Sequence, residues 1–257
     1  MPVTTSTKRS PTLTGCYLYA IVAGADDEQL VLDGIDGSTV YSISDGHLAA
    51  IVSNVPNVKL RPERRRLAAH HEVLKRLLAR GSLLPMAFGI IADGPTAVER
   101  ILALNRRSFA EQLARLNGTV EMGLRVTWDV PNIFDYFVAT HPALRSLRDQ
   151  VFRGGREPTQ EDRIELGRLF DRSLTQDRET HTATVLHTLN EHCIECKENK
   201  PRNECEVMNL ACLIRRDAQK KFEQGVFETA RQFDNHYAFD FNGPWPPHNF
   251  VDVDLRM

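Results

Sequence analysis

The sequence predicts an α+β fold, an α/β sandwich in which a modified ferredoxin-like N-terminal domain is followed by a helical α+β C-terminal domain. Segments typical of strands and helices alternate along the first half, as in a ferredoxin-like sandwich with an additional N-terminal strand. The pattern changes after Pro131, and 257 residues suffice for two modest domains. We therefore expect a flexible tail at residues 1–14, one domain at 15–130 and a second at 131–257.

The N-terminal elements follow from apolar spacing and turn residues. Positions 16–22 are rich in aromatic and β-branched residues and the run ends at Gly24, which is typical of a buried strand. Between residues 63 and 79 leucines recur at helical spacing, and Gly81 follows as a C-cap. Pro95 suits the first turn of another helix. In order, we expect strands at 16–22, 40–43 and 48–52, a helix at 63–79, a strand at 83–91, a helix at 95–116 and a strand at 120–130.

The second half is predicted to be richer in helix. Pro142 suits the first turn of a second short helix within residues 132–152. Thr159 is a good N-cap, with Asp162 three residues later, for a long polar helix that reaches residue 191. A charged loop carrying cysteines is expected to follow, as far as residue 205. The remaining expected elements are a strand at 207–214, a helix at 217–232 and strands at 237–241 and 250–255.

The overall charge and hydropathy exclude several classes of protein. The formal net charge is only -2, so the chain has no global attraction to nucleic acid or to an anionic membrane, and we expect neither as a partner. No run of 18 apolar residues is present to span a bilayer. The polar N-terminus lacks the apolar region of a secretory signal, and five cysteines, an odd number, favour a reducing cytoplasm.

Motifs that would carry catalysis are absent from the sequence. It contains no phosphate-binding loop, no dinucleotide-binding glycine motif and no nucleophile elbow, so we predict no catalytic residue and no cofactor. The run His70-His71-Glu72 lies in a predicted helix, where one packed and one solvated histidine are favoured over an acid–base role. The basic run at residues 64–66 lacks aromatic neighbours and is interpreted as a solvated helix face, with a contact for an acidic protein partner as the alternative.

A group of cysteines is the strongest candidate for site chemistry. Cys193 and Cys196 form a C-x-x-C motif, Cys205 follows, and His192 lies just upstream, as does the alternative ligand His187. Thiolates and imidazole at short spacing are ligands that zinc prefers. The candidate metal site therefore consists of Cys193, Cys196, Cys205 and His192. A redox-sensitive thiol pair and incidental cysteines remain open alternatives. Cys212, in an apolar run, is expected to pack as a small hydrophobic residue.

The most unusual stretch is the proline-rich run at residues 239–251. Its prolines remove backbone donors and hold the chain extended, which disfavours a helix or a central strand. One interpretation is a stiff elbow between two strands, with its tryptophan packed on the core. The alternative is a rigid contact surface for a partner, since rigid aromatic side chains are good anchors. The candidate contact residues are Trp245, Pro246, Pro247 and Phe250.

This run resembles the gas vesicle protein F/L family, whose members end in a strand followed by G-P-W-P-P-Y-x-F-V. The matching residues are Gly243-Pro244-Trp245-Pro246-Pro247-His248-Asn249-Phe250-Val251, with His248 at the tyrosine position. The order of other segments agrees. These are Tyr17-Leu18-Tyr19-Ala20-Ile21, Leu48-Ala49-Ala50-Ile51-Val52-Ser53, His71-Glu72-Val73-Leu74, Leu83-Leu84-Pro85-Met86-Ala87-Phe88-Gly89 and Met208-Asn209-Leu210-Ala211-Cys212-Leu213-Ile214.

The resemblance implies a non-catalytic accessory or minor structural protein of gas vesicles, located at the vesicle in the cytoplasm. It implies that the chain binds the small hydrophobic shell protein, together with other gas vesicle accessory proteins, and supports shell assembly. It also implies a modified ferredoxin-like domain followed by an α+β domain. The cysteine group is not part of the family pattern, so a metal- or thiol-dependent role of Cys193, Cys196 and Cys205 is kept as the alternative function.

Overall fold

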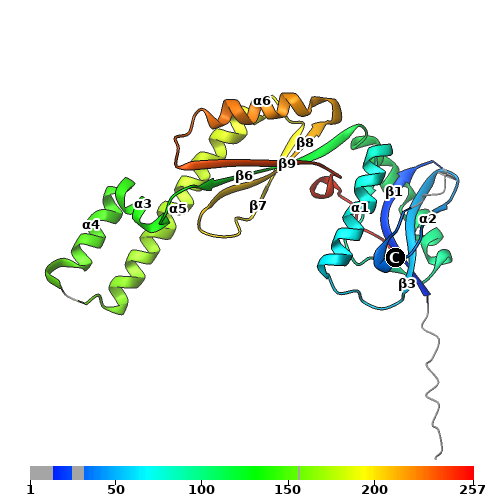
Figure 1. The fold of residues 1–257 in the computed structure, drawn as a ribbon, viewed down its shortest axis with the longest axis horizontal. Helices are drawn as coiled ribbons and strands as arrows, with labels where there is room; N and C mark the ends of the chain where they lie inside the picture. The colour runs from blue at the N-terminus through cyan, green and yellow to red at the C-terminus, as the bar shows by residue number, and fades with distance from the viewer. Residues whose placement is uncertain (1–13, 25–31, 156) are drawn as a thin grey trace, which may run out of the picture. The chain divides into compact units, whose positions relative to one another are not determined.

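The computed structural model describes residues 14–24, 32–155 and 157–257 (Figure 1). The predicted flexible tail therefore lies, except for Thr14, outside the described residues. The chain forms two compact units, one of Met1–Val120 with Trp245–Met257 and the other of Glu121–Pro244. Residues 121–130, expected in the first domain, belong to the second unit because their strand is part of its sheet.

The first unit is built on an antiparallel sheet with two long helices. Its strands run in the order β2-β3-β1-β4, with β5 also paired to β1. Strand β1 is central, and the six residues from Cys16 to Ile21 are fully buried, as expected for a strand covered on both faces. Both helices contact β1. The elements are β1 Thr14–Ala23, β2 Val40–Ser44, β3 Leu48–Pro56, α1 Arg64–Arg80, β4 Leu84–Pro85, β5 Ile91–Ala92 and α2 Pro95–Arg115.

The single strand expected at residues 83–91 is two short strands in the structure. The segment turns at Gly89, whose φ of +95° is readily adopted only by glycine. Hydrogen bonds on either side of this turn still tie it to β1, from Met86 N–H to the Tyr19 carbonyl and from Leu18 N–H to the Ile90 carbonyl. The apolar pattern thus indicated a strand segment here but not its interruption.

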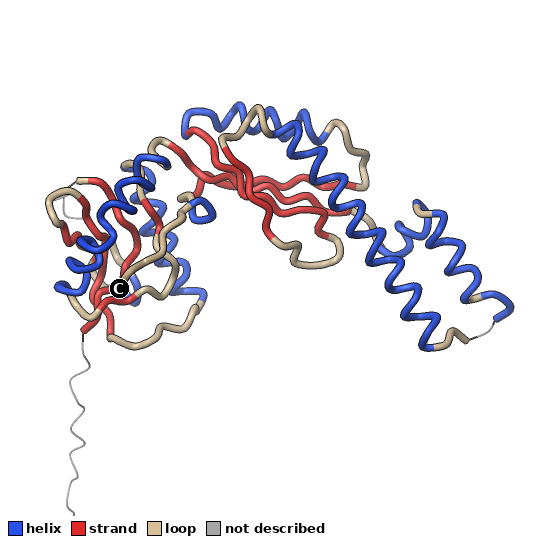
Figure 2. Tube along the Cα trace, turned by 180° about the vertical axis from the view of Figure 1, so that it is seen from behind, coloured by secondary structure: helices blue, strands red, loops and turns tan. Residues whose placement is uncertain are grey.

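The second unit combines a four-stranded sheet, in the order β7-β8-β6-β9, with four helices. Helices α5 and α6 contact each other and β8, so they cover the same face of the sheet, and α5 continues beyond it to pack against α3 and α4 (Figure 2). The elements are β6 Thr119–Trp128, α3 Ile133–Thr140, α4 Pro142–Val151, α5 Gln160–Leu189, β7 Glu195–Asn199, β8 Glu206–Arg215, α6 Gln219–Ala230 and β9 Tyr237–Trp245.

Two features of the second half differ from expectation. The cysteine loop contains the strand β7. The predicted strand at 250–255 is absent: a short 3₁₀ turn, His248–Phe250, is followed by extended chain without a strand partner. This segment bonds instead to α2, where the Asn105 amide contacts the backbone N–H and carbonyl of Arg256. Side chains of α2 thus take the place of a neighbouring strand. Within the described residues, none of the helices is both long and apolar enough to cross a bilayer.

Candidate functional site

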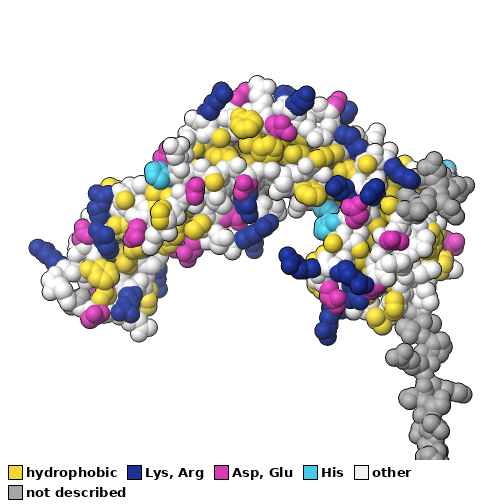
Figure 3. All heavy atoms as spheres, in the orientation of Figure 1, with side chains coloured by type: hydrophobic (Ala, Val, Ile, Leu, Met, Phe, Trp, Pro, Cys, Tyr) yellow, Lys and Arg dark blue, Asp and Glu magenta, His cyan; other side chains and the backbone are white. Residues whose placement is uncertain are grey.

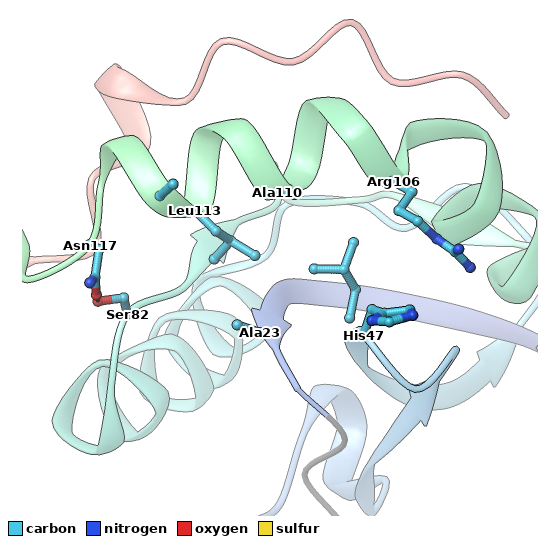
Figure 4. Close-up of a pocket in the computed structure, with 9 residues that line it drawn as sticks. Ala23, His47, Ser82, Arg106, Ala110, Leu113 and Asn117 are labelled. Atoms are coloured by element: carbon cyan, nitrogen blue, oxygen red, sulfur yellow. The ribbon is translucent and has the colours of Figure 1, made fainter.

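An apolar pocket of about 570 Å³ opens in the first unit between α2, the end of β1 and the turn before β3 (Figure 4). This volume is within the range of small-ligand and side-chain binding sites. Leu48 and Leu113 are buried and form its apolar floor, whereas Ala110 and Ala114 of α2 are exposed at its mouth. The lining residues are Ala23, His47, Leu48, Ser82, Arg106, Ala110, Leu113, Ala114 and Asn117.

The polar groups at the two ends of the pocket are paired with other protein groups. At one end the Arg106 guanidinium donates to the Asp45 carboxylate at 2.8 Å, and at the other the Ser82 hydroxyl donates to the Asn117 amide oxygen at 2.9 Å. Burial acts to raise the pKa of Asp45, but hydrogen bonds from the backbone of Leu48 and His47 and from Arg106 lower it overall. The pocket therefore offers apolar surface between satisfied polar ends.

The predicted contact residues near the C-terminus differ in accessibility. The Trp245 side chain, at the end of β9, is 42% exposed. By contrast, Pro246 and Pro247 are buried and Phe250 is fully buried in the first unit. The Arg115 guanidinium donates to the Phe250 carbonyl, which fixes the segment against α2. Only Trp245 of these four residues presents a large surface to a partner.

A further apolar surface lies on α6 and β9 in the second unit, where hydrophobic side chains gather below α6 in Figure 3. Phe227 of α6 is 60% exposed, and its ring centroid lies 6.4 Å from that of Phe241 on β9. Phe239 lies two residues before Phe241 on β9, so both project from the same side of the strand, and Phe239 is half-buried. β9 is an edge strand of its sheet, so one backbone edge of this strand has no neighbouring strand among the described residues.

Two histidines of the first unit, His70 and His248, pack in its interior. His70 is buried, with its Nδ1 atom 2.9 Å from the Tyr17 hydroxyl, and its ring lies 6.4 Å from that of His248. Desolvation, with a smaller contribution from neighbouring imidazoles, lowers the pKa of both His70 and His248 to about 4. Glu72 points elsewhere and pairs with Arg76 at 2.7 Å. These two imidazoles are thus neutral at pH 7, which agrees with packing rather than acid–base chemistry.

The cysteine group is only partly brought together. The sulfur atoms of Cys193, Cys196 and Cys212 all lie within 4.8 Å of one another. Hydrogen bonds from the other two thiols lower the pKa of Cys196. Cys205 is exposed just before β8, seven residues from Cys212. The His192 ring faces α6, with Nδ1 3.0 Å from the Lys221 carbonyl and Nε2 3.4 Å from the Glu228 carboxylate. Neither Cys205 nor His192 belongs to the group of three thiols.

Comparison with known proteins identifies the family. The sequence profile described as "Gas vesicle synthesis protein GvpL/GvpF" matches residues 15–252. The chain belongs to the GvpL/GvpF family. It is similar to gas vesicle protein F of a Streptomyces species, with 30% identity over 92% of this chain and 99% of the relative. The corresponding protein of a Nostoc species is 28% identical over 93% of this chain and 99% of the relative.

A solved structure of the same family confirms the α+β fold class. The crystal structure of GvpF from Anabaena sp. PCC7120 matches this GvpL/GvpF chain with a TM-score of 0.79 and 27% identity, over 94% of this chain and 99% of the other. The resemblance inferred from the C-terminal motif is therefore confirmed. A gas-vesicle-related role follows for the chain.

Sequence patterns did not reveal the pocket of this GvpL/GvpF protein. Its local signal is weak, because Ala110 and Ala114 are simply two alanines four residues apart on an amphipathic helix. The pocket forms only because folding brings Leu48, more than 60 residues earlier in the chain, close to these two alanines. Similarly, Cys212 joins Cys196 through strand pairing, which the spacing of cysteines along the chain does not encode.

Proposed function

We propose that this protein is a non-catalytic accessory protein of gas vesicles that binds the hydrophobic shell protein and supports shell assembly in the cytoplasm. The observation that carries the proposal is the family match along residues 15–252. A shell subunit that self-associates through apolar surface must be held apart before it is incorporated, because exposed apolar surface leads to aggregation. Other gas vesicle proteins are expected as further partners.

The pocket of the first unit is the contact surface that we assign to the shell protein. Its floor is apolar, and its polar ends are already paired, so apolar side chains can enter without leaving a buried polar group unsatisfied. The exposed alanines Ala110 and Ala114 leave room at the mouth for larger side chains of a partner. We therefore expect an apolar segment of the shell protein to bind here.

The same pocket supports a non-catalytic role. Its serine and its histidine, Ser82 and His47, lie at opposite ends (Figure 4), and the Ser82 hydroxyl donates to Asn117. A nucleophilic serine needs a base within hydrogen-bonding distance. The pocket residues are thus arranged for binding rather than for acyl transfer.

Binding is tested by co-expressing the tagged full-length chain with its shell protein and measuring how much shell protein co-purifies. In Ala114→Glu, a carboxylate is introduced at the apolar mouth, and its desolvation costs about 1–3 kcal/mol, which weakens binding by roughly 5- to 150-fold. Ala103→Glu is the matched control, because Ala103 is an exposed alanine of the same helix that does not line the pocket. It should bind like the wild type, and circular dichroism should show both variants folded.

Wild-type affinity of Ala114→Glu would contradict the pocket assignment. The other two exposed apolar surfaces are then tested in turn, the end of β9 with Trp245→Ala and the face of α6 with Phe227→Ser. If the wild-type chain fails to capture the shell protein, the proposed binding function itself is wrong.

A further inference from the structure

Three cysteines of the second unit converge from separate elements. Cys193 lies in the turn after α5, Cys196 in β7 and Cys212 in β8. Cys196 and Cys212 are direct partners in the antiparallel pairing of β7 with β8, and their sulfur atoms are 3.7 Å apart. The third sulfur lies within 4.8 Å of both. Strand pairing and the C-x-x-C spacing together therefore place three thiols around one point.

The spacing of the sulfur atoms fits a common metal ion. Zinc–sulfur bonds of about 2.3 Å at tetrahedral angles separate neighbouring sulfur atoms by about 3.8 Å. The sulfur atoms of Cys196 and Cys212 are 3.7 Å apart. The two sulfur–sulfur distances from Cys193 would need to shorten by no more than about 1 Å. A disulfide requires a sulfur–sulfur distance of about 2 Å and would leave one of the three thiols over. Three converging thiols are thus better matched to a metal than to a disulfide.

The surroundings of the thiols also favour a bound cation. Cys212 is fully buried and the other two cysteines are partly buried, so thiolates here would be shielded from water. Cysteine thiolates bind soft or borderline metals such as zinc(II) in preference to magnesium or calcium. A cation at this point would compensate the charge of the buried thiolates, which is costly without a partner.

We propose that Cys193, Cys196 and Cys212 bind one thiophilic metal ion of the zinc(II) class through three thiolates, with water as the fourth ligand. On binding, the three thiols release their protons to solvent and form three metal–sulfur bonds. Such a site would tie the edge strand β7 to β8 and to the turn after α5. It is separate from the shell-protein pocket, which lies in the first unit.

The proposal is tested by adding zinc(II) to the reduced, metal-free full-length protein and measuring bound metal by elemental analysis after desalting. One equivalent per chain is expected. Cobalt(II) serves as a second probe, because thiolate coordination gives it strong sulfur-to-metal charge-transfer absorption. The double variant Cys193→Ser/Cys196→Ser should lose at least about tenfold in zinc affinity. Cys205→Ser is the matched control, since Cys205 is exposed and outside the group, and it should bind zinc like the wild type.

Failure of the reduced wild-type protein to retain zinc would overturn the proposal, as would an equal loss of binding in Cys205→Ser. Because Cys212 is buried, Cys212→Ala is compared only after circular dichroism shows that it is folded. A Cys196–Cys212 disulfide found by mass spectrometry, together with reduced protein that binds no metal, would identify a redox pair instead and would equally overturn the metal site. All of these readouts are independent of shell-protein binding.

Discussion

His70 is buried and His248 is partly buried in the first unit, and the titration of their two neutral imidazoles limits the stability of this unit in acid. His70 packs among Tyr17, Tyr19 and His71, and the Nε2 atom of His248 is buried without a hydrogen-bond partner. Both imidazoles have a pKa of about 4 in the native protein. In the unfolded chain they return to about 6.5.

The free energy of unfolding should therefore fall as the pH decreases from about 6.5 to about 4. In this window the unfolded chain binds protons that the native core excludes, and each unit of pKa depression corresponds to about 1.4 kcal/mol. The free energy of unfolding is therefore unaffected by these two imidazoles above about pH 6.5 and decreases until the pH reaches their native pKa of about 4. In His248→Phe, this pH dependence should decrease by about half, as measured by urea unfolding at several pH values.

The exposed His47 of the same unit supplies the control variant, His47→Asn, which should keep the wild-type pH dependence. An unchanged slope in His248→Phe would show that His248 does not control acid stability.

Sequence patterns identified two of the three cysteines that lie together in the second unit. Cys193 and Cys196 were predicted from their C-x-x-C spacing and do lie together. Cys212 was expected to act only as a small apolar residue, yet it faces Cys196 across two strands. Its apolar neighbours reflect burial of β8, and burial does not prevent a thiol from pointing at other thiols. Cross-strand register was the missing information.

The long helix α5 shows how local sequence defines an element. Its predicted start is confirmed, because the Thr159 hydroxyl accepts from the Asp162 N–H and the Asp162 carboxylate accepts from the Thr159 N–H, which forms a capping box. The helix is 30 residues long and contacts α3 and α4 at one end and the sheet and α6 at the other. Its first turn thus depends mainly on the cap and on α3 and α4.

Thr159→Ala should destabilise the start of α5 by about 1 kcal/mol, because the Asp162 N–H loses its acceptor, the Thr159 hydroxyl. Amide exchange in a peptide spanning residues 159–164, followed by mass spectrometry, should then be about fivefold faster. Thr180→Ala is the control, since Thr180 lies in the middle of the same helix and its hydroxyl donates to the Gln176 carbonyl of that helix. Equal exchange in both variants would mean that the cap contributes nothing measurable.

Elements without such local signals were predicted less well. The segment after Phe250 alternates apolar and polar residues like a strand, but its backbone bonds to Asn105 of α2, more than 140 residues earlier. Similarly, β7 is polar and short, and it forms because β8 offers it an edge. Alternation and composition describe the faces of a segment. They do not specify which neighbour accepts its hydrogen bonds.

On the scale of the whole molecule, the chain passes from the first unit to the second at the start of β6 and returns at the end of β9. Sequence patterns placed a boundary at residue 130, where a strand ends and helices begin. They could not reveal the return, because it depends on Phe250 and the terminal residues packing on α2. The C-terminal motif that indicated the family is therefore also the segment that completes the first unit.

We propose that the pocket of the first unit holds the shell protein during vesicle assembly. Pressure-sensitive light scattering of the host cells tests it most directly, because intact gas vesicles collapse under pressure and the scattering drops. We predict that in-frame deletion abolishes this signal, that the wild type and Ala103→Glu restore it, and that Ala114→Glu does not. Full restoration by Ala114→Glu at normal protein level would show that the pocket does not hold the shell protein. An unchanged signal after deletion would show that the protein is not required for vesicle assembly.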